Sequence, residues 1–244
     1  MILYFFLIGL ALGSFTNVLI FRLPASISIV FPPSACPKCS ARIKWYDNIP
    51  LLSWIILRGR CRSCSTAISP EYPIVETISG VIAVLLYLKY GIKGETFIHL
   101  LLLPVFLSIV LIDFKTMFIH DSELIASAAI AIVYFILVWI RGNAIPLKNI
   151  YSALILLGIF FLIYFLGKII YKKEAFGSGD VLLAPVIGIF LPMEHLFTYM
   201  IVATVSAAIY GVTVRILHKK ESVPFGPFMI GAFYLVIFMG SELA

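Results

Sequence analysis

Long apolar runs, broken by short polar stretches, form the dominant pattern of this sequence. A helix that crosses a bilayer needs about 20 predominantly apolar residues. The runs predict eight such helices, at residues 2–21, 73–90, 96–113, 122–140, 150–171, 181–192, 196–216 and 225–243. The sixth run is short, because Phe190-Leu191-Pro192 ends it. We therefore expect an all-α, polytopic integral membrane protein with about eight transmembrane helices.

One long polar segment, residues 22–72, separates the first run from the others. The first run has no basic region before it and no small-residue cleavage site after it, which predicts a retained helix rather than a signal peptide. Three parts are therefore expected: a first transmembrane helix (1–21), a polar segment (22–72) and a membrane domain (73–244). We see no internal repeat in the sequence.

The composition supports a membrane protein. Hydrophobic residues make up 62% of the chain and charged residues 12%, whereas ordinary soluble domains carry about 25% charged residues. The mean hydropathy is +1.09. The net charge of +6 does not indicate nucleic-acid binding, because no basic run is long enough to follow a phosphate backbone.

The basic residues predict the orientation of the chain. Lys and Arg are enriched in the cytoplasmic loops of membrane proteins. If the N-terminus faces outward, 14 of the 18 Lys and Arg residues fall on the cytoplasmic side. The four on the outer side are Lys89, Lys93, Arg141 and Lys148. This orientation places the polar segment 22–72 in the cytoplasm.

Four cysteines in the polar segment predict a metal site. Cys36 and Cys39 form one C-x2-C pair, and Cys61 and Cys64 form a second pair after a gap of 21 residues. Four thiolates suit a tetrahedral zinc ion, whereas disulfides are rare in a reducing cytoplasm. Four cysteine ligands leave no open position for water, so the zinc is expected to be structural. A polar segment of this size has too little core to fold alone.

Two aspartates at membrane depth are the candidate catalytic pair. Asp113 ends the third predicted helix and Asp180 opens the sixth, so both fall at cytoplasmic helix ends. Two carboxyl groups a few ångströms apart share one proton: the ionised group accepts a proton from water and the neutral group donates to the peptide carbonyl. Gly177 and Gly179 precede Asp180, where they let the backbone approach an extended substrate and adopt positive φ.

Simpler interpretations of these aspartates remain open. Asp180 is also suited to capping the sixth helix after a glycine-rich turn. Asp113 is also suited to being a solvated charge at the membrane interface. Asp121, between His120 and Ser122, is best explained as the N-cap of the fourth helix.

A series of short motifs runs along nearly the whole chain: Gly9–Val18, Arg22-Leu23-Pro24, the paired cysteines, Asp47–Trp54, Leu57–Cys61, Ile68-Ser69, Tyr72-Pro73, Val75-Glu76, Leu111–Asp113, Gly177–Asp180 and Pro224–Phe228. Taken together and in this order, these motifs resemble the type IV prepilin peptidase family. Three positions depart from the family pattern. His120 precedes Asp121 where the family often has Pro, Leu182 stands where it often has Lys, and Glu71 stands where a basic residue is common.

The resemblance implies two activities in the bacterial inner membrane. One is cleavage of the basic leader of prepilins and pseudopilins just before their hydrophobic helix, with Asp113 and Asp180 as the catalytic aspartates. The other is methylation of the new N-terminus by S-adenosylmethionine, because the four cysteines resemble the bifunctional branch of the family. The substrate helix is expected to enter laterally from the lipid, with its leader on the cytoplasmic side.

The methyl-donor site is not assigned by the sequence. The polar residues that could contribute to it are Asp47, Asn48, Arg58, Gly59 and Glu76. Glu76 and Asn17 are equally suited to hydrogen bonds between helices. Three other functions remain to be distinguished: a peptidase without methyl transfer, a transporter whose aspartates carry protons or cations, and a non-enzymatic zinc-bearing assembly factor that binds pilin helices.

Overall fold

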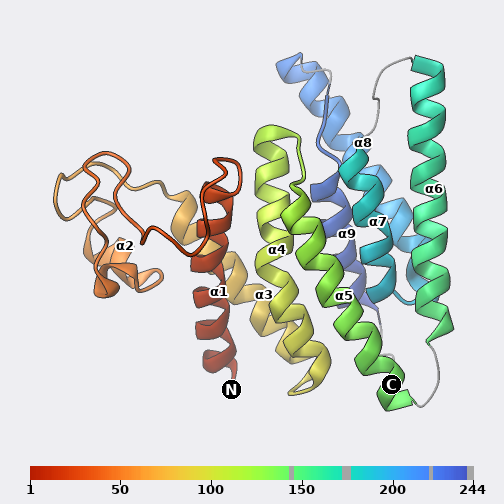
Figure 1. Ribbon diagram of the computed structural model, residues 1–244, viewed down its shortest axis with the longest axis horizontal. Coiled ribbons are helices and arrows are strands. Elements are labelled where there is room, and N and C mark those ends of the chain that lie inside the picture. The colour runs from red at the N-terminus through yellow and green to blue at the C-terminus, as the bar shows by residue number, and fades with distance from the viewer. Residues whose placement is uncertain (143–145, 172–176, 220–221, 241–244) are drawn as a thin grey trace. The chain divides into compact units, whose positions relative to one another are not determined.

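The computed structural model describes residues 1–142, 146–171, 177–219 and 222–240. Lys172, Lys173 and Lys220, which entered the charge count above, lie outside these residues. Helices are the regular secondary structure of the described chain, whose β-pairing is limited to two isolated bridges, and this confirms the predicted all-α class. Its helices are α1 (Ile2–Arg22), α2 (Leu52–Ile56), α3 (Glu71–Tyr90), α4 (Gly94–Thr116), α5 (Asp121–Gly142), α6 (Leu147–Tyr171), α7 (Ser178–Phe190), α8 (Leu196–His218) and α9 (Gly226–Met239), with short 3-10 helices at Trp45–Asn48 and Met193–His195 (Figure 1).

A helix occupies each of the eight predicted positions. Six apolar helical stretches of the described chain are long enough to cross a membrane: α1, α3, α4, α5, α6, and α8 with the short helix before it. α7 and α9 are apolar but shorter, with 13 and 14 residues. At about 1.5 Å per residue they extend roughly 20 Å, less than the hydrocarbon core of about 30 Å.

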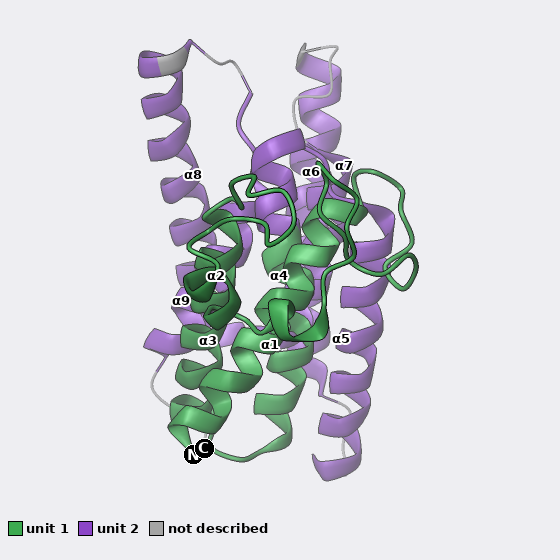
Figure 2. Ribbon diagram, turned by 90° about the vertical axis from the view of Figure 1, so that its left-hand side faces the viewer, with its two compact units in different colours: residues 1–108 green, residues 109–244 purple. Residues whose placement is uncertain are grey.

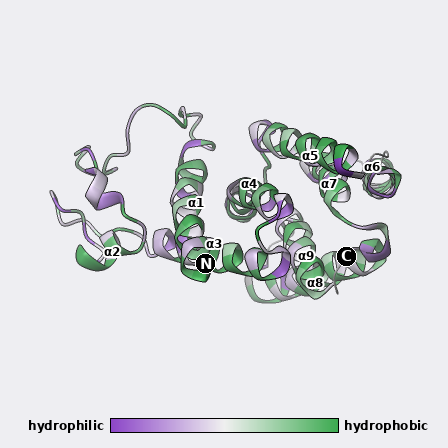
Figure 3. Cartoon of the chain, turned by 90° about the horizontal axis from the view of Figure 1, so that it is seen from below, coloured by the Kyte–Doolittle hydropathy of each residue, from purple (hydrophilic) through white to green (hydrophobic). Residues whose placement is uncertain are grey.

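The chain divides into two compact units, Met1–Ser108 and Ile109–Ala244, coloured separately in Figure 2. The division falls within α4. In both units the helices are dominated by hydrophobic residues, as their colouring in Figure 3 shows. This pattern is expected where helix surfaces face lipid rather than water.

In the first unit, α1 and α3 pack as an antiparallel pair. Phe5 stacks on Tyr87 near one end, and the Asn17 side-chain amide donates to the Tyr72 carbonyl near the other, at 3.2 Å. Between them, a Cβ on Gly9 would lie 2.5 Å from the Ser79 carbonyl oxygen, and a Cβ on Gly13 would lie 2.6 Å from a backbone carbon of α3. Two glycines four residues apart therefore let the helix backbones approach closely, as in small-xxx-small packing.

Side chains from these helices also hold the start and the middle of the polar segment. The buried Arg22 guanidinium donates to the Ser28 carbonyl at 2.7 Å and to the Pro32 carbonyl at 2.6 Å. The Leu51 backbone N–H, at a residue with φ of 61°, donates to Glu76 Oε2 at 2.8 Å. The polar segment is therefore attached to the helix pair through hydrogen bonds as well as through the chain.

In the second unit, α7 packs against α5, α6 and α9. A Cβ on Gly188 would lie 2.5 Å from the Ala153 backbone of α6, and the Asn149 amide donates to the Ile189 carbonyl at 2.7 Å. Tyr134 of α5 contacts the Phe190 ring at 4.9 Å. These contacts bury α7 despite its short length, and they fix the helix that carries Asp180.

Candidate functional site

The second unit brings together the carboxyl groups of Asp113 and Asp180. Asp113 lies in the last turn of α4 and is 4% exposed; Asp180 lies in the first turn of α7 and is 7% exposed. Both face the start of α9. A Cβ placed on Gly226 would lie 2.9 Å from Asp113 Oδ2 and 3.4 Å from Asp180 Oδ1. The two carboxyl groups therefore border one carbon-sized position, which glycine leaves open.

The simpler interpretations of both aspartates are wrong in this structure. The N-cap of α7 is Gly177 and no side chain caps that end, so Asp180 is not a capping residue. Asp113 is buried, so it is not a solvated interfacial charge. Within the described chain, Asp113 Oδ2 and Asp180 Oδ1 make no hydrogen bond of regular geometry, although the Gly226 backbone N–H interacts with both carboxyl groups. Buried carboxyl oxygens without a regular hydrogen bond are costly, and they are available to bind a substrate or water.

The two predicted active-site glycines differ from their expected conformation. Gly177 has φ of −68°, and Gly179 is helical; among the described glycines only Gly59 and Gly91 have positive φ. The prediction of positive φ is therefore wrong. Close approach is nevertheless observed: a Cβ on Gly177 would lie 2.9 Å from Asp180 Oδ2. What this turn requires is the absence of a side chain rather than an unusual backbone.

Ile119 forms an apolar wall beside the carboxyl groups. Its side chain would lie 3.0 Å from a Cβ on Gly179 and 3.3 Å from a Cβ on Gly226. Ile119 was not predicted from the sequence, and Gly226 was part of the Pro224–Phe228 stretch without a role of its own. A glycine flanked by proline and aromatic residues was the available signal, but the sequence does not show which carboxyl groups it faces.

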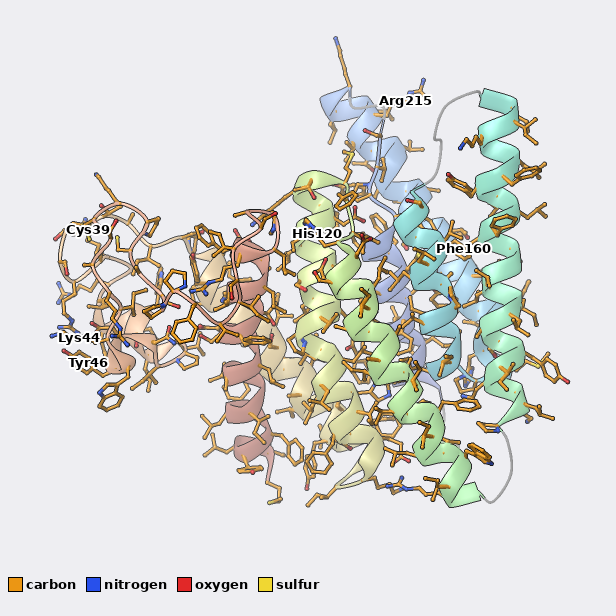
Figure 4. The ribbon with its side chains drawn as sticks, viewed as in Figure 1. Cys39, Lys44, Tyr46, His120, Phe160 and Arg215 are labelled. Carbon is orange, nitrogen blue, oxygen red and sulfur yellow. The ribbon has the colours of Figure 1, made fainter. Side chains whose placement is uncertain are left out.

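The connection between α4 and α5 corrects the interpretation of Asp121. Asp121 is the first helical residue of α5 and is exposed. The His120 backbone N–H donates instead to Glu123 Oε2 at 3.3 Å, as in a capping box. Figure 4 shows His120 at this junction. Leu182, at the second departure from the family pattern, is 55% exposed on α7 and is not part of the buried core.

The four cysteines of the first unit form a candidate metal centre. Cys36 Sγ lies 3.8 Å from Cys64 Sγ, and Cys39 Sγ lies 4.0 Å from Cys61 Sγ. All four sulfurs lie within 4.8 Å of one another. A tetrahedral zinc ion with Zn–S bonds of about 2.3 Å separates its sulfurs by about 3.8 Å. The sulfur arrangement therefore fits a single tetrahedral ion.

Each cysteine pair lies in a turn of its own, and the two turns have the same hydrogen-bond pattern. In the first, the Cys36 N–H donates to the Ala41 carbonyl at 3.0 Å; in the second, the Cys61 N–H donates to the Thr66 carbonyl at 2.8 Å. A β-bridge closes each turn, between Ala35 and Arg42 and between Arg60 and Ala67. The expectation of no internal repeat is corrected at this scale, because C-x2-C-Ser occurs in both turns.

The four thiols of the polar segment have different acidities. The hydrogen bond with the Thr66 side chain lowers the pKa of the Cys64 thiol to about 6, and backbone hydrogen bonds around Cys39 lower the pKa of Cys36, whereas burial and the neighbouring thiols raise the pKa of Cys39 to about 11. Four adjacent thiols cannot all ionise without a cation, because the charges repel. Arg62 forms a bidentate pair with Asp47, with contacts of 2.6 and 2.9 Å, and this lowers the pKa of Asp47.

The five candidate methyl-donor residues lie in different settings. Asp47 pairs with Arg62, and Glu76 accepts from the Leu51 backbone. Gly59 packs on the Trp54 ring, 2.9 Å from where its Cβ would be. Asn48 and Arg58 are exposed, and Arg58 lines a surface hollow of about 580 Å³. Figure 4 labels Cys39, Lys44 and Tyr46, which lie in the same polar segment, residues 22–72.

Comparison with known families and proteins extends these observations. Residues 7–90 match the bacterial peptidase A24 N-terminal domain, and residues 100–212 match the type IV leader peptidase family. A type 4 prepilin-like proteins leader peptide-processing enzyme of Escherichia coli O78:H11 is 30% identical over 90% of this chain and 87% of its own length. A prepilin leader peptidase/N-methyltransferase of Aeromonas salmonicida is 29% identical over 99% of this chain and 92% of its own length.

A third relative is longer. The prepilin leader peptidase/N-methyltransferase of Myxococcus xanthus is 32% identical over 86% of this chain, which spans 62% of the length of that relative. No solved structure matches the chain.

Proposed function

Because the chain belongs to the type IV leader peptidase family, we propose that it cleaves the leaders of prepilins and pseudopilins and then methylates the new N-terminus. The observation that carries the peptidase half is the convergence of the buried Asp113 and Asp180 carboxyl groups on Gly226. The prepilin substrates and the methyl transfer are inferred from the family. The proposed location is the bacterial inner membrane.

The proposed cleavage uses the two carboxyl groups as an acid and a base. The ionised carboxylate accepts a proton from water, whose oxygen attacks the scissile carbonyl carbon, while the neutral carboxyl group donates a proton to the carbonyl oxygen. The tetrahedral intermediate then collapses: its hydroxyl proton returns to the acid, the C–N bond breaks, and the amine leaves with the proton taken from water. Both carboxyl groups end in their starting state.

The arrangement suits a substrate that reaches the site from the membrane. Asp113 and Asp180 lie at the ends of α4 and α7 that the positive-inside rule assigns to the cytoplasm. A prepilin with a basic leader and an apolar helix would leave its leader on that side. The cleavage point would then lie at the depth of the two aspartates.

We propose that Cys36, Cys39, Cys61 and Cys64 hold a structural zinc ion. The four sulfurs fit a tetrahedral ion and supply a closed set of ligands. Such an ion would stabilise a segment that has little apolar core of its own. If the zinc is structural, we expect its loss to destabilise the polar segment without removing a group that takes part in peptide hydrolysis.

The methyl donor, S-adenosylmethionine, would supply an electrophilic methyl group to the amine that cleavage releases. The side chains considered for its site are largely engaged elsewhere: Asp47 with Arg62, Gly59 with Trp54, and Glu76 with the Leu51 backbone. Arg58 and Asn48 remain exposed. These five residues therefore do not define a donor site.

The test measures cleavage of a prepilin in membranes by wild type, Asp113→Asn and Asp180→Asn, with labelled S-adenosylmethionine present throughout. Each substitution keeps the size of the side chain but removes its acid–base function, so each should abolish cleavage. Retained cleavage by either variant would remove that residue from the mechanism. Label incorporation by wild type distinguishes the bifunctional enzyme from a peptidase alone.

The same variants separate the other functions. A transporter would change proton or cation flux without releasing a leader. A non-enzymatic assembly factor would bind prepilins equally well in all three proteins and cleave in none. Wild-type cleavage rules out the assembly factor as the complete function.

A further inference from the structure

The short helix α2 exposes an apolar surface within an otherwise polar segment. Leu52, Ile55 and Ile56 are 56%, 63% and 70% exposed. In Figure 3 this helix is predominantly hydrophobic, whereas the loops around it are mixed. Several large apolar side chains exposed together on one short element mark a surface that binds something apolar.

The position of α2 within the first unit indicates what covers this surface. Trp54 of α2 and the first turns of α3 line an apolar groove of about 370 Å³, with Pro73, Ile74 and Ile78 on the α3 side. α3 has the length and composition of a membrane span and begins at Glu71. Ile78 lies roughly 10 Å along the helix from that end. α2 therefore lies beside the first turns of α3, the end at which this candidate span begins (Figure 1).

The orientation of Trp54 is fixed. Its indole Nε1–H donates to the Ile68 carbonyl at 3.3 Å, and its ring packs on Gly59, which has φ of 66°. The indole thus has a polar atom engaged toward the loop and an apolar ring lining the groove. This amphipathic placement is typical of tryptophans at a membrane–water interface.

Cationic side chains continue from the apolar surface. Arg58, Arg60 and Arg62 line a hollow of about 580 Å³ that also includes Ile56. Arg62 is paired with Asp47, whereas Arg58 and Arg60 are exposed and form no ion pair with a described residue. Apolar residues bordered by arginines match the two layers of an anionic leaflet, its acyl chains and its headgroups.

We propose that α2 is an interfacial helix that docks the metal-binding segment onto the anionic membrane surface. Leu52, Ile55 and Ile56 enter the acyl region beside α3, and Arg58 and Arg60 contact lipid phosphates. The inference rests on α1 and α3 crossing the membrane and is independent of the catalytic aspartates. Docking would restrict the segment to the membrane surface from which a prepilin leader emerges.

The first test uses Trp54 as a depth probe. The chain has three tryptophans, so Trp45→Phe with Trp139→Phe leaves Trp54 alone. The full-length protein is placed in lipid nanodiscs with acyl-brominated lipid, or in unbrominated nanodiscs with aqueous iodide. We expect strong quenching by brominated lipid and weak quenching by iodide. The reverse result would overturn the proposal, and a single-Trp139 protein serves as the control within a candidate span, α5.

The second test addresses the charge. In the single-Trp54 protein, a brominated anionic lipid should quench more than a brominated zwitterionic lipid at equal mole fraction and low salt. Arg58→Gln with Arg60→Gln should lower the relative affinity for the anionic lipid by roughly 30-fold. Arg42→Gln, at an exposed arginine of the other cysteine turn, is the matched control. Equal quenching by both lipids in the parent protein would overturn the anionic-lipid assignment.

A protein occupant is distinguished in the same preparation. If a prepilin helix covers α2, added prepilin peptide will protect Trp54 from iodide in nanodiscs where brominated lipid does not quench it. That outcome overturns lipid docking. Quenching by brominated lipid that added peptide does not change supports it. Because the readout is fluorescence, loss of peptidase activity in any variant does not affect the result.

Discussion

Gly226 determines how closely the carboxyl groups of Asp113 and Asp180 can border the start of α9. A methyl group there would lie 2.9 Å from Asp113 Oδ2, which is closer than real Cβ contacts allow. Gly226 does not have positive φ, so alanine is sterically rather than conformationally excluded. Gly226 therefore contributes to the site because it has no Cβ, which leaves space beside both carboxyl groups.

We expect Gly226→Ala to reduce prepilin cleavage by about 100-fold, because small displacements of reacting groups have effects of that order. Initial cleavage rates in membranes measure this. The matched control is Gly231→Ala on the same helix, where a Cβ meets nothing within 4 Å. Equal activity of the two variants would show that the carboxyl groups can move aside without cost.

The ion pair between Asp47 and Arg62 leads to a prediction about pH. The pairing lowers the pKa of Asp47 below its ordinary value of about 3.9. The ion pair therefore stabilises the folded segment fully at pH values above the ordinary pKa of Asp47. This stabilisation is lost only as the pH falls through the lower pKa that Asp47 has in the folded protein. Arg62→Gln should destabilise the polar segment only slightly, since Arg62 is half exposed and solvent screens its charge.

We expect Arg62→Gln to destabilise the polar segment equally at pH 6 and at pH 8. The measurement is the chelator concentration that removes the metal, compared between wild type and Arg62→Gln at each pH. Lys38→Gln, in the other cysteine turn, controls for the loss of a positive charge near the cysteines. A difference that changes between pH 6 and pH 8 would mean that a group other than Asp47 titrates with Arg62.

At the scale of elements, the α1–α3 pair depends on small residues more than on apolar ones. Gly9 and Gly13 of α1 face Ser79, Gly80 and Ala83 of α3 at distances that exclude a side chain. Little hydrophobic driving force joins two helices in lipid, so close backbone packing supplies the association. Larger side chains on this face should separate the helices.

We expect Gly9→Val to destabilise the first unit by about 1–3 kcal/mol, the usual cost of overpacking. Detergent-induced unfolding followed by helical circular dichroism measures the change. Gly158→Val in α6, where a Cβ meets nothing within 4 Å, controls for the intrinsic helix preference of valine. If both variants unfold at the same detergent concentration, α1 and α3 do not depend on this contact.

The sequence predicted the positions of the long helices but not the details of their ends. Apolar runs of membrane length specify a helix with little ambiguity, because a backbone in lipid must satisfy its own hydrogen bonds. The cap of α5 was assigned to Asp121, whereas Glu123 bonds the His120 N–H. The helix α2 was not predicted, because five residues between turns carry no usable periodicity. Helix caps and short helices such as α2 depend on local contacts, which a hydropathy pattern does not report.

At the scale of the whole molecule, the two candidate centres lie in different units. The four cysteines belong to the first unit, and Asp113, Asp180 and Gly226 belong to the second. The cysteines were identifiable from spacing alone, since two C-x2-C pairs suffice for a tetrahedral site. The aspartates needed a prediction of topology and a family resemblance. Gly226 could not be assigned, because only the fold shows which atoms a glycine faces.

This separation predicts how the protein responds to metal removal. The spans keep their internal hydrogen bonds without metal, whereas residues 22–72 are held by turn hydrogen bonds, the Asp47–Arg62 pair and hydrogen bonds to Arg22 and Glu76, with little apolar core. Chelation should therefore make this segment sensitive to protease while the helical circular dichroism changes little. Mass mapping of the cleavage sites, with one metal ion per chain before treatment, measures the effect.

A Cys36→Ala and Cys64→Ala protein provides the comparison, since it should show the same cleavage sites with no chelator present. Adding zinc back should protect the wild-type chain but not this variant. If chelation instead melts the helices broadly, the metal stabilises more than the segment that carries it. If the segment resists protease without metal, its hydrogen bonds to Arg22 and Glu76, together with contacts of α2 such as the proposed lipid docking, are sufficient to hold it.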